Sequence, residues 1–196
     1  MFETLLYYIK TSWRWLMRCR YSRGFGIQSP SAYSFVCNVV NNHHVYDCYD
    51  ELQEEMSNHS KTFRKLGMLF CRLAYYWQPQ YVVMGDYDFA SYVYAGHPST
   101  LVRMIDDYYF ADEPSSALVI LDIDWLDDDN LLNELLDSAR ENLLLVVMGI
   151  YKNKHNRKLW HDILADERCG VTYDLYSCAI IFFDKSKYKQ IYKINF

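Results

Sequence analysis

The hydrophobic pattern of the chain changes near residue 80. Before that point apolar residues recur at helical spacing, and Ser29 and Ser60 stand as N-cap residues in front of two such segments. They predict helices over about 30–42 and 60–77, because a serine side chain satisfies free backbone N–H groups at the start of a helix. The first part of the chain is therefore expected to be helical.

Beyond residue 80 the apolar residues form short continuous runs with helical segments between them. The runs occupy residues 81–85, 117–123 and 142–149, followed by VTYDLY and AIIFF near the C-terminus. The intervening segments predict helices over 98–108, 129–139 and 154–165. Strands that are apolar at nearly every position and alternate with helices predict a parallel sheet covered by helices on both faces.

Two segments of this second part depart from the regular pattern. Only Ser177 and Cys178 separate the last two apolar runs. Because so short a connection holds no crossover helix, we expect an antiparallel hairpin at the edge of the sheet. The stretch FASYVYAG, residues 89–96, fits either a helix or a strand, and both alternatives stay open.

Length and composition favour one domain in a reducing compartment. A chain of 196 residues, 51% of them apolar, is long enough to bury one core, so we expect a single domain over 1–196 with a helical extension (1–77) and an α/β core (78–196). The six cysteines show no paired spacing, which predicts reduced thiols. The apolar stretch LLYYI ends at Lys10, too short for a signal sequence or a membrane span. We therefore expect a cytoplasmic protein.

Charge is distributed unevenly along the chain. The net charge is −5, yet residues 104–141 hold twelve acidic side chains and one basic one, Arg140, whereas residues 1–23 are basic and apolar. The overall acidity argues against nucleic-acid binding. The basic segment predicts a first helix that packs on its own domain, with contact of residues 1–20 with an anionic membrane surface or an acidic partner as alternatives.

The run that starts at Tyr81 ends in MGDYDF, residues 84–89. One glycine followed by an aspartate is typical of a strand that ends at a nucleotide, but the further glycines of such a loop are absent. Tyr87 and Phe89 stand where a ligand would need space, so their placement decides whether a cofactor fits. A pocket beside Gly85 would favour an enzyme, and a side chain in that space would argue against one.

Four features together resemble a known family. They are RGFGIQSPSAYSFV near the N-terminus, the order of strands from Tyr81, the helix RKLWHDI at 157–163, and the ending VTYDLYSCAIIFF. The chain resembles a divergent O-methyltransferase-like group among the class I methyltransferases that depend on S-adenosylmethionine (SAM). This resemblance implies a Rossmann-like methyltransferase fold, with a mainly parallel sheet that ends in an antiparallel C-terminal hairpin and with an N-terminal helical extension.

The same resemblance implies where SAM would bind. In such enzymes the first strand ends in E/D-x-G-x-G-x-G, and here only Gly85 matches a glycine of that motif. Gly85 and Asp86, with Asp122 at the end of a later strand, are the candidate cofactor-binding residues. The carboxylate that would hold the ribose at the end of a second strand has no clear counterpart, so the motif is degenerate.

Asp122 and Asp124 together would offer oxygen ligands to a divalent metal. A metal site needs a further acidic residue at the next strand end, where the sequence has Met148, Gly149 and Ile150, so we expect none. The acidic run 127–129 is expected instead to cap the following helix.

Two functions remain open. The first is SAM-dependent transfer of a methyl group to an unknown small acceptor, a displacement that needs positioning rather than a fixed catalytic residue, so no catalytic residue is assigned. The second is a non-catalytic, degenerate methyltransferase fold that contacts a protein partner through the basic N-terminus or the acidic 104–141 segment.

Overall fold

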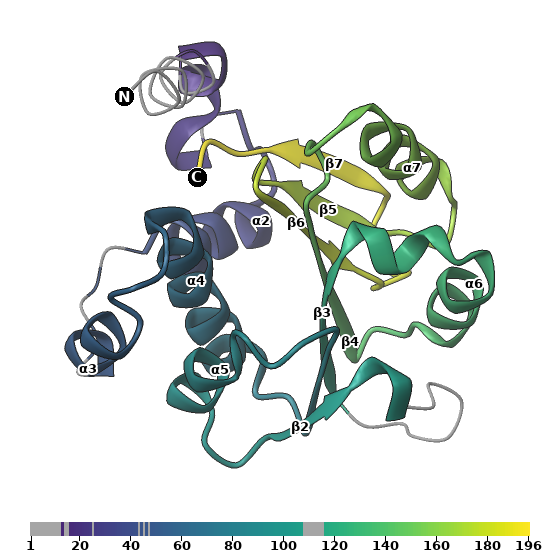
Figure 1. The fold of residues 1–196 in the computed structure, drawn as a ribbon. Coiled ribbons are helices and arrows are strands. Elements are labelled where there is room, and N and C mark those ends of the chain that lie inside the picture. The colour runs from purple at the N-terminus through teal and green to yellow at the C-terminus, as the bar shows by residue number, and fades with distance from the viewer. Residues whose placement is uncertain are drawn as a thin grey trace.

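A computed structural model (Figure 1) describes residues 13, 16–24, 26–42, 44, 46, 48–107 and 116–196. The helices in these ranges are α2 (Pro30–Phe35), α3 (Cys48–Glu55), α4 (Lys61–Trp77), α5 (Ala90–Gly96), α6 (Asp129–Ser138) and α7 (Lys154–Ala165). The strands are β1 (Tyr81–Met84), β2 (Leu101–Met104), β3 (Ala117–Asp122), β4 (Leu143–Met148), β5 (Val171–Asp174), β6 (Cys178–Phe182) and β7 (Gln190–Lys193).

These strands form one sheet in the order β2-β1-β3-β4-β6-β5-β7. The first four strands are parallel to one another, and β6 lies antiparallel to both β4 and β5. The predicted fold class, a mainly parallel sheet that ends in an antiparallel hairpin, is confirmed.

The sheet separates two hydrophobic clusters, because successive side chains of a strand point to opposite faces. Val82 of β1 packs on one face with Leu73 of α4, while Val83 packs on the other face with Trp160 of α7. In Figure 1, α2, α4 and α5 lie to the left of the sheet and α6 and α7 to the right. The helical segment before residue 78 therefore contributes to the same core as the strands.

The predicted helix starts are confirmed by their hydrogen bonds. The Ser29 side chain accepts from Ala32 N at the start of α2, and Ser60 accepts from Phe63 N at the start of α4. The helix α4 ends at Trp77, whose indole N–H donates to Ala117 O at 3.0 Å and so ties the end of the helix to the first residue of β3.

The predicted helix over 98–108 is wrong. Residues Leu101–Met104 form β2, followed by a 3₁₀ turn at Ile105–Asp107. The parallel strand β1 leaves backbone groups unpaired on one side, and Leu101 N donates to Gln80 O at 2.9 Å where the two strands begin. The backbone hydrogen bonds of this pairing favour a strand here, although the spacing of the apolar residues is that of a helix. The undecided stretch before it forms the helix α5.

The expectation that the C-terminal hairpin lies at the sheet edge is also wrong. The strand β7 pairs in parallel with β5 on its outer side, with Tyr173 opposite Tyr192, and the sequence analysis did not predict it. The loop before β7 turns at Asp184, whose carboxylate accepts from Ser186 N at 3.0 Å.

Most of the basic N-terminal segment lies outside the described residues. Trp13 and Leu16 are helical, with exposed fractions of 64% and 56%, and Cys19–Gly24 form a 3₁₀ segment. Within the described ranges, no helix combines the length and the apolar content needed to cross a bilayer.

Candidate functional site

The three residues predicted to bind a cofactor come together at the carboxyl end of the parallel strands. Gly85 and Asp86 follow β1, and Asp122 ends β3. All three line one small cavity together with Phe89 and Met148. In an open α/β sheet this is the edge at which ligands bind. Cofactor binding by these residues stays a prediction.

The cavity at this edge is nearly filled. Its volume is about 10 Å³, which is the space of a single water molecule at most. Phe89 is only 6% exposed, stacks on Phe63 with ring centroids 4.2 Å apart, and meets the edge of Phe70 at 4.8 Å. Tyr87, in contrast, is 57% exposed and points away from the core. Phe89 is therefore the side chain that occupies the space where the glycine-rich loop would leave room.

Trp125 covers Gly85 from the other side. A β-carbon on Gly85 would collide with the Trp125 Nε1 atom and lie 2.9 Å from its Cδ1 atom. Trp125 belongs to the 3₁₀ turn Ile123–Asp127, which follows β3 directly. Position 85 thus needs glycine because the Trp125 ring lies against it, a contact for which the sequence holds no local signal.

Asp86 is exposed, and its carboxylate is used locally. The Oδ1 atom accepts from Asp88 N at 3.0 Å, which closes a short turn after β1. The same carboxylate lines the small cavity, so it lies at the predicted place and also shapes the loop that carries Phe89.

Asp122 lies against the next strand end. Its Oδ1 atom accepts from Asp124 N at 3.2 Å and so caps the 3₁₀ turn. A β-carbon on Gly149 would lie 2.9 Å from Asp122 Oδ2, and Gly149 has a φ of +73°, a backbone angle that favours glycine. Burial raises the pKa of Asp122 above its ordinary value. Gly149 therefore makes room for a half-buried carboxylate, a role that the sequence analysis missed.

Asp124 contacts Asn156 and Lys152. Asn156 Nδ2 donates to Asp124 Oδ1 at 2.9 Å, and Lys152 Nζ lies 3.2 Å from Oδ2. The hydrogen bond from Asn156 lowers the pKa of Asp124, and Lys152 adds to this effect. In the described part of the chain, no three acidic, histidine or cysteine side chains are grouped as they would be around a metal ion.

The acidic run after β3 serves the start of α6 as predicted. Asp128 is the N-cap residue, and its side chain accepts from Asn130 N at 2.9 Å. Asp127 pairs with His155 of α7 at 2.8 Å. The contact with His155 joins the 3₁₀ turn Ile123–Asp127 to α7.

Comparison with known proteins defines the fold. No family model matches the chain, and no curated protein matches its sequence. Among solved structures, it is similar to the SAH-bound methyltransferase PaMTH1 of Podospora anserina, with a TM-score of 0.52 and 14% sequence identity over 85% of this chain and 97% of that chain. At this identity the likeness shows a Rossmann-like methyltransferase fold.

Proposed function

We propose that this protein is a non-catalytic, degenerate methyltransferase fold that acts in the cytoplasm as a protein-interaction module. The observation that carries the proposal is the cavity of about 10 Å³ at the carboxyl edge of β1 and β3. Pockets for small ligands have volumes of roughly 300 to 1,000 Å³. The space between Gly85 and Asp122 is far below that range.

Side-chain packing keeps this edge closed. For SAM to enter, Phe89 would have to leave its stack with Phe63, and Trp125 would have to move off Gly85. Exposing a buried phenylalanine side chain costs roughly 1.5 to 3 kcal/mol before any loss of packing. Binding energy from SAM would have to offset that cost, and the glycine loop that normally provides it is absent.

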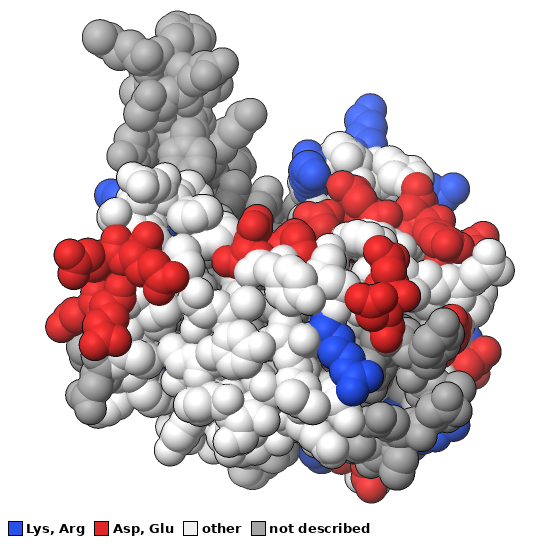
Figure 2. Space-filling model, turned by 60° about the horizontal axis from the view of Figure 1, so that its bottom comes forward, with Lys and Arg blue, Asp and Glu red and all other residues white. Residues whose placement is uncertain are grey.

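Two surfaces are candidates for the partner. Trp13 and Met17 leave 64% and 61% of their surface exposed, an unusual exposure for large apolar side chains. Figure 2 shows acidic side chains gathered in groups on one face of the molecule. Exposed acids of the 104–141 segment include Asp129 and Glu134 of α6. The cytoplasmic location is supported by Cys71, Cys169 and Cys178, all buried as thiols.

The second candidate is SAM-dependent methyl transfer to an oxygen or nitrogen atom of a small acceptor. Gly85, Asp86 and Asp122 line one cavity, and the similar methyltransferase from Podospora anserina binds SAH. In this function the bond between carbon and the sulfonium sulfur would break as the bond to the acceptor forms. Phe89 would have to move out of this cavity before SAM could bind.

Isothermal titration of the protein with SAM and with SAH separates the two functions. The proposal expects no heat and no thermal shift at millimolar ligand. A Phe89→Ala variant removes the ring that fills the cavity, and Tyr87→Ala, two residues away and exposed, is its control. Micromolar binding by the wild type that Gly85→Trp abolishes would refute the non-catalytic function and justify a search for the acceptor.

The interaction itself is tested by proximity labelling in the native cell. A Trp13→Ser/Met17→Ser variant changes the exposed apolar surface, and a Glu134→Lys variant changes the acidic one. If wild-type partners are lost in only one of the two variants, the surface changed in that variant is the one that binds them. Identical partners in both variants and in the wild type would rule out both surfaces.

A further inference from the structure

A second cavity lies at the opposite edge of the sheet from Gly85. It has a volume of about 390 Å³, and Phe182 of β6 is part of its lining. Phe182 pairs with Leu144 near the start of β4, whereas the filled cavity lies where β4 ends, at Met148. The larger cavity is therefore separate from the edge at which the fold binds cofactors, and an inference about it does not depend on whether SAM binds.

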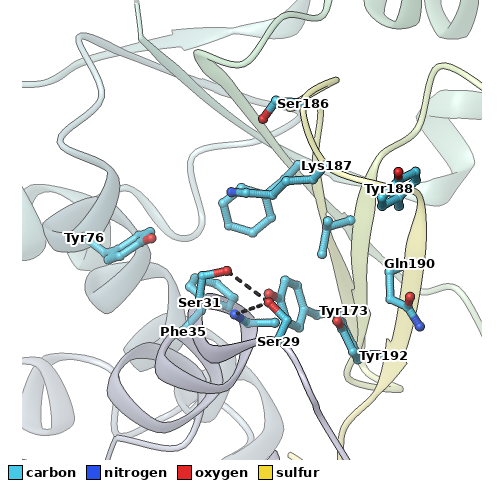
Figure 3. A pocket seen from close by; sticks show the side chains of 13 residues that line it. Ser29, Ser31, Phe35, Tyr76, Tyr173, Ser186, Lys187, Tyr188, Gln190 and Tyr192 are labelled. Carbon is cyan, nitrogen blue, oxygen red and sulfur yellow. Dashed lines mark hydrogen bonds between the residues drawn. The ribbon is translucent and has the colours of Figure 1, made fainter.

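Aromatic rings form the walls of this cavity. Phe35 of α2 lies at their centre, with ring centroids 4.8 Å from Tyr173, 5.1 Å from Phe182 and 5.3 Å from Tyr76. Tyr192 of β7 stacks on Tyr173 at 5.4 Å. The rings come from α2, α4, β5, β6 and β7 and surround the space on several sides (Figure 3). Such walls offer ring faces and edges to a flat ligand.

Two hydroxyl groups lie on one side of the cavity. Ser29 and Ser31 belong to the segment RGFGIQSPS, whose sequence motif has no role at the filled cavity. Their Oγ atoms are 3.1 Å apart, because the N-cap position of Ser29 brings them to the same side of the helix start. One of the two is able to donate a hydrogen bond to an acceptor atom of a ligand.

Among the described residues that line the cavity, Lys187 has the one charged side chain. It comes from the loop before β7 and reaches over the cavity opposite Ser29 and Ser31 (Figure 3). Its Nζ atom lies 3.0 Å from Asp184 Oδ2, and its side chain is 53% exposed. An ammonium group has three donors, so the ion pair with Asp184 leaves donors for a second anion.

We propose that this cavity binds a small planar aromatic acid. Its ring lies against the wall that Phe35, Tyr76 and Tyr173 form, and its carboxylate binds Lys187. One serine hydroxyl is a further donor, because the hydrogen of the other is used between Ser29 and Ser31. The volume fits this class, since a cavity of roughly 150 Å³ lined by apolar side chains holds one benzene ring. A space of about 390 Å³ accommodates one or two fused rings with an acidic substituent.

The test is a calorimetric titration of the full chain with 2-naphthoate. Its neutral isostere 2-naphthamide and the non-aromatic acid cyclohexanecarboxylate are the comparison ligands. The proposal expects 2-naphthoate to bind at least about fivefold more tightly than either, because each comparison ligand lacks one of the two recognised features. Equal binding of the acid and the amide, or no binding of 2-naphthoate at all, would overturn it.

Two pairs of variants locate the site. Lys187→Met should weaken binding of 2-naphthoate by about three- to tenfold. The effect is modest because the Lys187 side chain is half exposed. Lys185→Met, two residues away, should leave the affinity unchanged. Tyr76→Ala should weaken it similarly, and Tyr75→Ala is the matched control, since Tyr75 is exposed and does not line this cavity. Circular dichroism verifies that each variant is folded. Binding that none of the four variants changes would refute the site.

Discussion

The buried ion pair between Arg18 and Asp174 provides a quantitative prediction about stability. Asp174 is 1% exposed, and Arg18 Nη2 lies 3.0 Å from both of its carboxylate oxygens. The same guanidinium donates through Nη1 to the backbone oxygens of Asp174 and Ile194. Arg18 therefore joins the N-terminal segment to β5 and to the chain after β7. We predict that Arg18→Met destabilises the protein substantially.

The magnitude follows from what remains around the carboxylate. Removing one partner of a buried ion pair costs about 3 to 5 kcal/mol. Tyr151 still donates to Asp174 Oδ2 at 2.6 Å, and Tyr176 N donates to Oδ1 at 2.9 Å. Burial raises the pKa of Tyr151, so its hydroxyl stays protonated and keeps donating. Since these neutral donors remain, we expect the lower end of the range, about 3 kcal/mol, and a Tm lowered by about 6 to 12 °C.

Urea unfolding at pH 7, followed by tryptophan fluorescence, measures this loss. Arg20→Met is the control, because Arg20 is exposed and its guanidinium lies over the Tyr21 ring, 4.8 Å from the ring centroid. The free energy of unfolding should change by less than about 0.5 kcal/mol in this variant. In the Arg18→Met background, Asp174→Asn should recover part of the loss, because it removes the unpaired charge. A loss below about 1 kcal/mol for Arg18→Met, or no recovery in the double variant, would refute the reasoning.

Two further predictions concern the filled carboxyl edge. Asp122→Asn should raise the free energy of unfolding at pH 7, because burial raises the pKa of the folded carboxyl and so disfavours its ionised form. The gain should vanish below the unfolded pKa of about 3.9, and a gain that stays constant in urea unfolding from pH 7 to about pH 3 would contradict this. Gly85→Ala should lower the free energy of unfolding by about 1 to 3 kcal/mol, because the new β-carbon would clash with Trp125. The loss should be smaller in a Trp125→Ala background, and equal losses in both backgrounds would exclude the clash as its cause.

The order of most elements follows from local signals in the sequence. Ser29 and Ser60 determine two helix starts because capping depends on neighbouring residues only. The strand β2 was mistaken for a helix because Leu101, Val102 and Ile105 fit either structure at this length, and the partner that decides between them, β1, lies many residues earlier. The strand β7 has an exposed Ile191 beside a half-buried Tyr192, so its sequence shows no clean alternation of polar and apolar positions.

The place of the candidate site was predictable, and its closure was only partly so. The end of a parallel strand locates Gly85, Asp86 and Asp122 because strand ends of a parallel sheet share one edge. The missing glycines indicate Tyr87 or Phe89 as residues that could fill the space, and of the two only Phe89 is buried there. The contact of Trp125 with Gly85 is not predictable from local sequence. It forms only when the 3₁₀ turn after β3 folds back over β1, and this fold depends on tertiary packing.

The persistence of the sheet without its glycine loop has a physical explanation. Residues of β1 such as Val82 and Val83 are fully buried between helices on both faces, so the strand contributes to the core whether or not a ligand lies at its end. The loop beyond Met84 adds Phe89 to the core cluster on one face of the sheet. An empty space at the strand end would cost stability. The rings of Phe89 and Trp125 pack at this end, so side chains of the chain itself stabilise it.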